Sequence, residues 1–402
     1  MSETDERELL EGPAIEPALS AAAGALLGTL EAWSLRGLHH RPAAGITGIY
    51  AVRCEGADGP FDGFLCVSTR NIEGDFRRSV RLEGPGSIPL LVWSHPNDPL
   101  LPDLPWACDA PSVGRDLFGV PAAALTTLGY RPMRRAVLRA EAAGELRFLK
   151  VVQHGRAALL RHRHELLHNA GIPVPPPVDS PAHDVVVTLP VPGVPLAQRL
   201  MVNGASELDP RALVGLLAQL PPTARNLPER PPWSARVQDY ARAAAVVLPA
   251  ENERILVLAS RVEEMIRAAP SGPVVPTHGD FYEGNLLVRD GSITGVLDLD
   301  SVGPGHLVDD LACFLAHLAV LPCVDARYTE VPAALVRFQQ AFEEVTNPFA
   351  LRARAAGVAL TLIAGARRPG QDAVSGTWRA DALGRLRVAE DFLKPDGTSP
   401  AS

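Results

Sequence analysis

Along the first hundred residues, an Ala- and Leu-rich start gives way to short segments of alternating apolar and polar residues. Residues 10–36 carry the Ala and Leu and are predicted to form one or two helices. Short alternating runs broken by Gly, Asp and Pro are typical of antiparallel strands. The runs here are TGIYAVRC, FDGFLCVSTR, RSVRLEG and SIPLLVWS, followed by the Pro-rich loop HPNDPLLPDLPW. This part predicts a small unit of helix plus antiparallel sheet.

Longer strands and then helices follow. The segment TTLGYRPMRRAVLRAEAAGELRFLKVVQ predicts three strands joined by turns, and GRAALLRHRHELLHNAG predicts a helix that stops at Gly171. After the loop IPVPPPVDS, the segment DVVVTLPVPGVPLAQRL predicts a strand, a Pro- and Gly-rich connector and the start of a helix. Residues 195–270 and 311–395 are predicted to be mostly helical.

This order of elements predicts an α+β protein in three parts. Residues 1–107 would form an N-terminal extension, 108–190 a small β-rich lobe, and 191–402 a large helical lobe. A chain of 402 residues is long enough for two or three such units. It is also long enough to bury a core without disulfides.

Composition and charge narrow the possible partners. The chain is 47% hydrophobic and 21% charged, close to the average for globular proteins. Its formal charge of −8 argues against nucleic acid as the main partner, because phosphate-backbone binding needs a basic surface. A small anionic ligand in a local basic pocket is still compatible with this charge.

Cysteines and apolar runs point to the cytoplasm. The five cysteines form no CxxC pair and have no zinc-type spacing, so we expect reduced thiols. The acidic start MSETDERELLEG lacks the pattern of a signal peptide. The runs LACFLAHLAVLP and AAGVALTLIAGA are shorter than the roughly 20 residues that span a bilayer, and we expect buried helices and no membrane partner.

The densest group of chemically active residues lies between residues 276 and 312. His278-Gly279-Asp280 is followed after four residues by Asn285, and LLVRDGSITGVLDLD then predicts a hairpin ending at Asp298. The hairpin would bring Asn285 and Asp298 together. Their oxygens are hard donors suited to Mg²⁺, and Asp280 is placed to act as a base on a hydroxyl. Singly, each Asp is equally explained as a turn cap or strand end; the whole set at these spacings is not.

The segment HGDFYEGNLLV…GVLDLDSVGPGHLVDDLA resembles the catalytic segment of the aminoglycoside phosphotransferase and choline kinase family. The resemblance covers about residues 115–390 and implies a protein-kinase-like fold of two lobes. It implies that Asp280 is the catalytic base and that Asn285 and Asp298 bind Mg²⁺. His278 would orient the loop or serve only as a structural His. Asp300 matches a more variable position, and Asp310 a structural one.

Upstream residues match further parts of the same family. Lys150, in the apolar run RFLKVV, would contact the ATP phosphates and pair with Glu165 of the following helix. A solvated helix face is the other explanation of Glu165. The segment VVVTLPVPGVPL resembles the linker between the lobes, where the resemblance implies adenine contacts at Thr188, Leu189 and Val191.

One segment departs from the family pattern. The loop between the first two strands of the β-rich lobe reads YRPMRR, whereas a Gly-rich loop would let backbone amides close over phosphates. Arg131, Arg134 and Arg135 are candidates to supply charge instead, and Arg135 is our expected phosphate contact. A solvated basic turn is the alternative.

The sequence thus predicts an ATP- and Mg²⁺-dependent phosphotransferase acting on a hydroxyl of a small molecule. If the acceptor is cationic, the acidic chain would help to gather it. A sugar or amino-sugar kinase is an alternative, since maltokinase-like and glucosamine-kinase-like relatives carry an N-terminal unit, although their motif tends to have Gln at the Asn285 position. An inactive nucleotide-binding scaffold is an alternative of another class.

Overall fold

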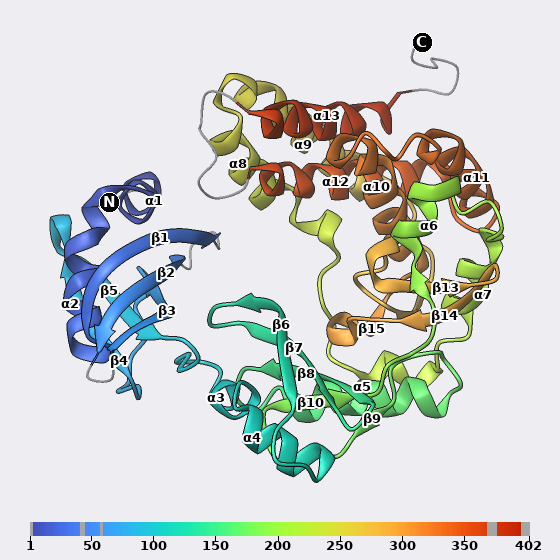
Figure 1. The fold of residues 1–402 in the computed structure, drawn as a ribbon. Helices are drawn as coiled ribbons and strands as arrows, with labels where there is room; N and C mark the ends of the chain where they lie inside the picture. The colour runs from blue at the N-terminus through green and yellow to red at the C-terminus, as the bar shows by residue number, and fades with distance from the viewer. Residues whose placement is uncertain (1–2, 41–44, 57–58, 368–375, 395–402) are drawn as a thin grey trace. The chain divides into compact units, whose positions relative to one another are not determined.

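The computed structural model describes residues 3–40, 45–56, 59–367 and 376–394, in two compact units (Figure 1). The first unit comprises the described residues of 1–161 and 177–190. The second comprises those of 162–176, 191–367 and 373–402. The chain passes from the first unit to the second inside helix α5, returns between Pro176 and Pro177, and passes to the second unit again between Pro190 and Val191. The predicted three-part division stays a prediction, because the extension and the β-rich lobe fall in one unit.

The N-terminal extension is a five-stranded antiparallel sheet with two helices on one face (Figure 1). Tyr50 sits in the core between them and donates a hydrogen bond of 2.7 Å from its hydroxyl to the carbonyl of Leu10. The strands lie in the order β1-β2-β3-β5-β4. The elements are α1 (Glu3–Glu11), α2 (Glu16–Leu26), β1 (Thr29–His40), β2 (Ile46–Gly56), β3 (Gly59–Ser68), β4 (Ser79–Gly84) and β5 (Ile88–Ser94).

The prediction of helix up to residue 36 is wrong for its last part. Residues 29–40 form strand β1, which pairs with β2 from Thr29 opposite Glu55 to His40 opposite Ile46. Ala and Leu favour a helix weakly, and pairing with a neighbouring strand overrides such preferences. The four strands that the sequence predicts for the extension are confirmed as β2 to β5.

The second sheet of the first unit is also antiparallel and five-stranded, in the order β6-β7-β8-β10-β9. The three predicted strands are confirmed, and β9 is a short addition in the predicted loop. Two short helices, α3 (Leu104–Ala107) and α4 (Ala110–Val113), contribute to its apolar core. The strands are β6 (Ala124–Arg131), β7 (Arg135–Ala142), β8 (Glu145–Val152), β9 (Pro177–Val178) and β10 (Val185–Thr188).

The second unit is mainly helical, as predicted. Its small strands are β11 (Val194–Pro195), β12 (Val274–Thr277), β13 (Leu286–Arg289), β14 (Ser292–Val296) and β15 (Gly303–His306). Its helices, beginning with the second half of α5 (Ala157–Asn169), are α6 (Leu196–Asn203), α7 (Arg211–Ala218), α8 (Val237–Val247), α9 (Asn252–Ala268), α10 (Leu307–Val324), α11 (Val331–Glu343), α12 (Pro348–Leu362) and α13 (Thr377–Asp391). Together the two units confirm the predicted fold class, a β-rich region followed by a helical part.

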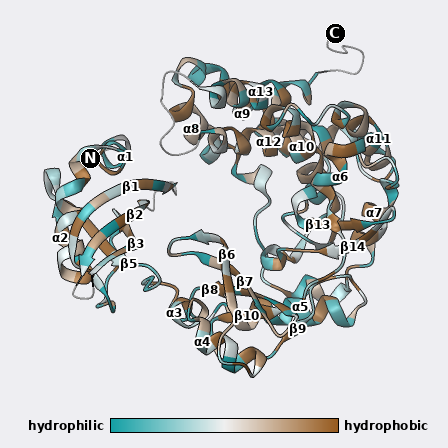
Figure 2. Cartoon of the chain, in the orientation of Figure 1, coloured by the Kyte–Doolittle hydropathy of each residue, from teal (hydrophilic) through white to brown (hydrophobic). Residues whose placement is uncertain are grey.

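Helices α10 and α12 form the centre of the second unit. Figure 2 shows how hydrophobic they are, and in length and composition Leu307–Val324 and Pro348–Ala366 are able to cross a membrane. Both are longer than the apolar runs noted in the sequence. However, 61% and 72%, respectively, of an apolar 18-residue stretch in each is buried inside the protein, as in core helices.

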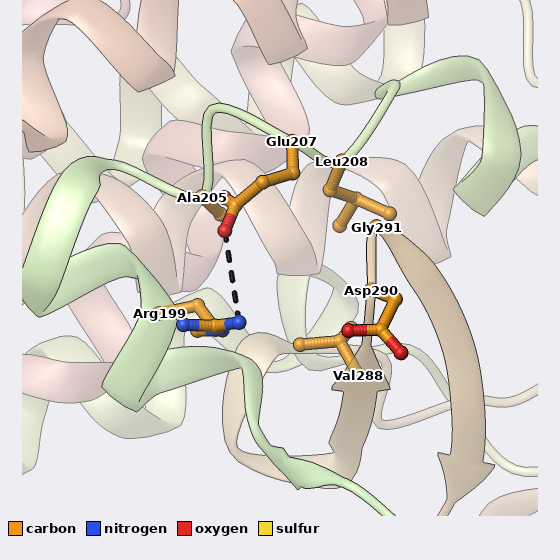
Figure 3. Close-up of a pocket in the computed structure, with 7 residues that line it drawn as sticks. All are labelled: Arg199, Ala205, Glu207, Leu208, Val288, Asp290 and Gly291. Atoms are coloured by element: carbon orange, nitrogen blue, oxygen red, sulfur yellow. Dashed lines mark ion pairs between the residues drawn. The ribbon is translucent and has the colours of Figure 1, made fainter.

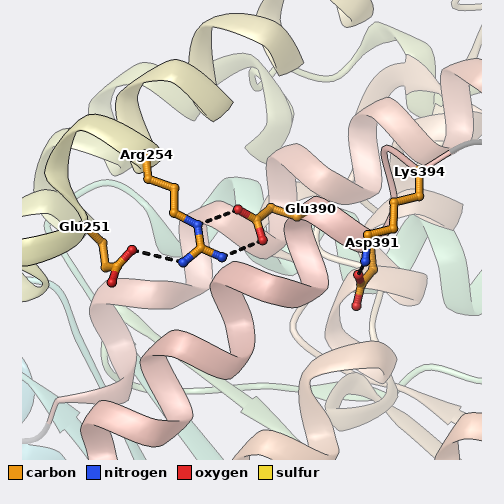
Figure 4. Close-up of polar contacts among 5 residues, drawn as sticks. All are labelled: Glu251, Arg254, Glu390, Asp391 and Lys394. Atoms are coloured by element: carbon orange, nitrogen blue, oxygen red, sulfur yellow. Dashed lines mark hydrogen bonds and ion pairs between the residues drawn. The ribbon is translucent and has the colours of Figure 1, made fainter. Parts of the chain in front are cut away.

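A charged cluster at the surface joins α9 to α13. Arg254 donates two hydrogen bonds of 2.7 Å to the carboxylate of Glu390 and one of 3.0 Å to Glu251 (Figure 4). These hydrogen bonds raise the pKa of Arg254 above its ordinary value. Nearby, Lys394 pairs with Asp391 at 2.5 Å.

Candidate active site

The β13–β14 hairpin brings Asn285 and Asp298 to the same end of the second unit's small sheet. Its two-residue turn is Asp290-Gly291, with φ of 51° and 72°, the left-handed backbone that tight hairpin turns require. At the open end, the amide of Leu297 donates 2.8 Å to the carbonyl of Asn285. The predicted hairpin is confirmed, and the two residues flank its open end.

The loop before the hairpin, His278-Gly279-Asp280, is fixed by one buried carboxylate. Asp310, in the first turn of α10, accepts hydrogen bonds of 2.7 Å and 2.8 Å from the backbone amides of His278 and Gly279. Asp310 is 2% exposed, and this burial raises its pKa to about 6. Gly279 has φ of 77°, and a Cβ there would lie 2.6 Å from the carbonyl oxygen of Ser301. The loop therefore needs both the carboxylate and the glycine.

His278 is a buried part of the same loop. Its Nδ1 accepts a hydrogen bond of 3.3 Å from the amide of Asp280. Nε2 must then carry the proton, and it donates 2.9 Å to the carbonyl of Leu297. The imidazole thus ties the loop to the end of the hairpin, which is compatible with both predicted roles, orienting the loop and serving as a structural His.

The side chain of Asp280 meets a residue that the sequence did not single out. Trp233, in a 3₁₀ turn at Trp233–Arg236, donates from its indole Nε1 to Oδ1 of Asp280 at 3.0 Å. The indole ring packs against Tyr240 with ring centroids 5.8 Å apart. Trp233 lies 47 residues upstream in a segment predicted to be helical, and nothing in RPPWSAR indicates contact with the HGD loop.

Asn285 and Asp298 offer oxygen atoms suited to a divalent cation. The side-chain amide of Asn285 donates from Nδ2 to the carbonyl of Asp280 at 2.9 Å, so Oδ1 is its oxygen for a ligand. Asp298 has φ of 58° and ψ of 60°, a conformation that is costly for a residue with a side chain and that concentrates at functional sites. The pKa of Tyr282 rises to about 12, first through burial and then through the charges of Asp280, Glu283 and Asp298.

This donor set fits a magnesium ion that keeps other ligands. Mg²⁺ usually takes one or two protein oxygens and completes its shell with phosphate oxygens and water. Within the described ranges, no group of three or more His, Cys, Asp or Glu side chains is arranged to hold a metal alone. One amide oxygen and one carboxylate suit an ion that arrives with a polyphosphate.

A cavity lies behind the loop, lined among others by Arg230, Trp233, Gly279, Ser301 and Cys313. The exposed Arg230 donates 2.7 Å to the hydroxyl of Ser301 and 3.4 Å to the carbonyl of Asp300. Gly279 and Trp233 both line this cavity. Because Asp280 follows Gly279 in the chain and accepts a hydrogen bond from Trp233, the cavity lies next to Asp280.

The segment after Asp298 is held by a second, buried arginine. Arg163 of α5 donates 2.7 Å to the carbonyl of Asp300 and 3.0 Å to that of Val302. Burial is the main cause that lowers its pKa. The backbone next to the cavity is therefore fixed from the side of α5.

A second, shallower pocket borders the closed end of the hairpin. It is lined by Arg199, Ala205, Glu207, Leu208, Val288, Asp290 and Gly291 (Figure 3). Arg199 and Glu207 approach to 3.7 Å across it. Because it adjoins the turn and not Asn285, it is separate from the Asp280 site.

The remaining predicted site residues lie on the first unit or at its borders. Lys150 is half-buried in β8, the middle strand of its sheet, opposite Val137 and Val186. Arg135 begins β7. Thr188, which is buried, ends β10, and Leu189 follows it.

Two predicted residues belong to the second unit. Glu165 is exposed on α5, and Val191 begins the segment that leads to β11. The pairing of Lys150 with Glu165 stays a prediction, because the two residues belong to different units. The same holds for a nucleotide site formed by Lys150, Asn285 and Asp298.

A comparison with models of known protein families finds one match. The sequence model of the "phosphotransferase enzyme family" matches residues 134–356, more than half of the chain. This match includes Lys150, the HGD loop and the whole β13–β14 hairpin. No curated protein sequence matches the chain.

Among solved structures, similar chains include a choline/ethanolamine kinase family protein from Mesorhizobium loti. It is 19% identical, with 68% of this chain and 89% of that one covered and a TM-score of 0.47. Spectinomycin phosphotransferase APH(9)-Ia, solved with ADP and spectinomycin, is 14% identical, with 70% and 95% covered and a TM-score of 0.49. An ethanolamine kinase from Plasmodium vivax is 13% identical, with 66% and 82% covered and a TM-score of 0.47. Similarities of this degree carry no information about the reaction or the substrate.

Proposed function

Because this chain belongs to the phosphotransferase enzyme family, we propose that it transfers the γ-phosphate of ATP, with Mg²⁺, to a hydroxyl of a small molecule. The observation that carries the proposal is the arrangement around Asp280. A carboxylate on a braced loop is followed by a hairpin whose open end holds an amide oxygen and a second carboxylate. Base, metal-binding Asn and metal-binding Asp are the parts that kinase chemistry requires.

Asp280 would align the acceptor hydroxyl and take its proton. The two backbone hydrogen bonds to Asp310 fix the loop, and the hydrogen bond from Trp233 to Oδ1 orients the carboxylate that would meet the hydroxyl. Positioned general bases contribute about 10²- to 10⁴-fold to a rate. The cavity beside Trp233 and Gly279 is where we place the acceptor.

Asn285 and Asp298 would hold Mg²⁺, which when bound neutralises charge on the phosphate oxygens. The hydrogen bond from Nδ2 of Asn285 to Asp280 keeps Oδ1 turned away from that carbonyl. Arg163 holds the backbone just after Asp298 through Asp300 and Val302, which limits movement of the carboxylate.

The nucleotide contacts of this proposal follow the family pattern. Lys150 and Arg135 would meet phosphates, with Glu165 pairing with Lys150, and the backbone at Thr188, Leu189 and Val191 would meet the adenine. Lys150 projects from the middle strand of an apolar sheet, where a charge is unfavourable unless it meets an anion.

The acceptor is tested by incubating the chain with ATP, Mg²⁺ and a panel of hydroxyl compounds, including amino alcohols, aminoglycosides, sugars and amino sugars. Mass spectrometry would detect a gain of one phosphate. A scaffold would bind ATP and phosphorylate nothing.

The metal ligands are tested by titrating Mg²⁺ against turnover. Asp298→Asn should raise the Mg²⁺ concentration for half-maximal turnover by about tenfold or more, since carboxylate charge governs cation affinity. Asp290→Asn, at the exposed turn of the same hairpin, is the matched control and should leave it unchanged.

A further inference from the structure

The β6–β7 turn rests on the extension's sheet. Along β3 and β5, alternate residues point to opposite faces, and Leu65 and Val92 face α1 and α2. On the other face, Cys66, Leu91 and Trp93 form an apolar cluster with Met133 of the turn. Met133 is only 4% exposed. The extension therefore packs against the very loop that departs from the glycine-rich pattern.

A single carboxylate ties this turn to the segment after β5. Oδ2 of Asp98 accepts hydrogen bonds of 2.7 Å from the backbone amide of Met133 and 2.7 Å from the hydroxyl of Tyr130. Its Oδ1 accepts 2.9 Å from the amide of Leu100. Asp98 is 4% exposed, and these donors, together with the backbone amide of Leu101, offset the cost of burying its carboxylate.

Tyr130 extends the connection into the sheet. Its hydroxyl donates to Asp98 and accepts from the indole Nε1 of Trp93 at 3.3 Å. The ring of His95 meets the Tyr130 ring edge-on, with centroids 4.9 Å apart. Trp93, Tyr130 and Asp98 thus form a hydrogen-bonded series from strand β5 of the extension to the turn.

Backbone polar groups of the turn are already engaged in hydrogen bonds. Met133 has φ of 59°, its amide is held by Asp98, and its carbonyl accepts 2.7 Å from the side chain of Gln153. The amide of Arg134 donates 3.0 Å to the carbonyl of Arg131. Amides held in this way are not available to close over phosphates. Any phosphate contact from this turn must come from arginine side chains, whose direction depends on the conformation of the backbone that carries them.

We propose that Asp98 is a positioning residue of the nucleotide site, fixing the β6–β7 turn so that its arginines meet the phosphates of ATP. The extension then acts as a support for phosphate binding and not only as a cover for the lobe. This inference rests on the proposed function, since it assumes that the chain binds ATP.

The test compares dissociation constants for ATP and for adenosine in the full-length chain. Tyr130→Phe, which removes one hydrogen bond to a charged group, should weaken ATP binding about tenfold. Asp98→Ala, which removes the acceptor of the Met133 amide as well, should weaken it by at least as much. Adenosine has no phosphates, so its dissociation constant should stay unchanged. Asp98→Asn keeps one acceptor oxygen and should lie between parent and Asp98→Ala.

The matched control is Asp103→Ala. Asp103 accepts a backbone amide, that of Asp184, at 2.7 Å in the same unit but away from the turn, so its loss should weaken ATP and adenosine equally or not at all. If Asp98→Ala fails to fold, Asp98→Asn and Tyr130→Phe carry the test.

The outcomes separate the two proposals. A folded Asp98 or Tyr130 variant with an unchanged ratio of the two constants overturns the positioning role and leaves phosphotransfer intact. The positioning role is also overturned if Asp103→Ala changes the ratio of the ATP and adenosine dissociation constants as much as Asp98→Ala does. A parent chain that binds no ATP overturns both proposals together.

Discussion

The indole Nε1 of Trp233 donates a hydrogen bond of 3.0 Å to Oδ1 of Asp280. An indole can only donate, and therefore it fixes one oxygen of the carboxylate as an acceptor and orients the other. The contact joins a residue of the helical segment to the loop that the sequence marks as catalytic. It makes Trp233 part of the proposed site.

Trp233→Phe should lower kcat about tenfold while the KM for ATP stays unchanged. The ring is largely kept, but the donor that orients Asp280 is lost, and hydrogen bonds to charged groups are worth roughly 1.5–3 kcal/mol. Steady-state kinetics with the acceptor from the panel measure this split. Tyr240→Phe, which alters the ring packed on Trp233 without touching the indole donor, should behave like the parent. Parental kcat in Trp233→Phe would remove Trp233 from the site.

Asp310→Ala should destabilise the fold by about 2–4 kcal/mol, because it leaves the amides of His278 and Gly279 without their buried acceptor. Asp310→Asn keeps one acceptor oxygen and should lose less. Urea unfolding at neutral pH measures both. Asp209→Ala removes an exposed acceptor of the Arg211 amide and should change stability by no more than about 0.5 kcal/mol. Equal effects of Asp310→Ala and Asp209→Ala would contradict a bracing role.

Gly279→Ala should abolish turnover and destabilise the chain. The new Cβ would meet the carbonyl oxygen of Ser301 at 2.6 Å, in a backbone conformation with φ of 77°. At Gly215, inside α7, an added Cβ would meet no atom within 4 Å outside the backbone of its own helix and its chain neighbours. Gly215→Ala should therefore raise stability by roughly 0.5–1 kcal/mol. Thermal unfolding of the two variants should shift in opposite directions, and a parallel shift would show that the loop is not so constrained.

Glu283→Gln should stabilise the protein above neutral pH but not in acid. Glu283 is 5% exposed, its Oε2 has no hydrogen-bond partner in the described structure, and burial raises its pKa to about 7. The folded state holds the proton more tightly than the unfolded one. The contribution of Glu283 to the free energy of unfolding is therefore fully present below the ordinary pKa of 4.5, and it is lost as the pH rises through about 7.

The neutral glutamine has no such dependence. At pH 8 we expect the free energy of unfolding of the variant to exceed that of the parent by roughly 1–3 kcal/mol. Below pH 4.5 we expect the two to be equal. Urea unfolding across this pH range measures the difference, with Glu253→Gln on the exposed face of α9 as control. A pH-independent difference would show that Glu283 is not buried as a neutral acid.

The sequence predicted those parts of the structure that local patterns determine. Most strands of the two five-stranded sheets and the Asp290-Gly291 hairpin follow from alternation and turn residues, and the hairpin then places Asn285 beside the strand that leads to Asp298. Strand β1 was missed because its Ala and Leu carry no β signal, and only pairing with β2 makes it a strand.

Contacts between distant segments could not be predicted in this way. Trp233 reaches Asp280 across 47 residues, and Asp98 reaches Met133 across 35. In both cases the partner is a lone Trp or Asp in a Pro-rich segment, where no periodicity reveals its direction. The tertiary fold alone brings these donors and acceptors together.

The central claim is that Asp280 serves as the base in phosphoryl transfer from ATP to a small-molecule hydroxyl. It is tested most directly by measuring kcat for the panel acceptor and the dissociation constant of ATP in the parent, Asp280→Asn and Asp290→Asn. We predict that Asp280→Asn lowers kcat by about 10²- to 10⁴-fold with ATP affinity retained, and that Asp290→Asn matches the parent. Parental turnover in Asp280→Asn, or a parent chain that binds ATP yet phosphorylates no member of the panel, would contradict the claim.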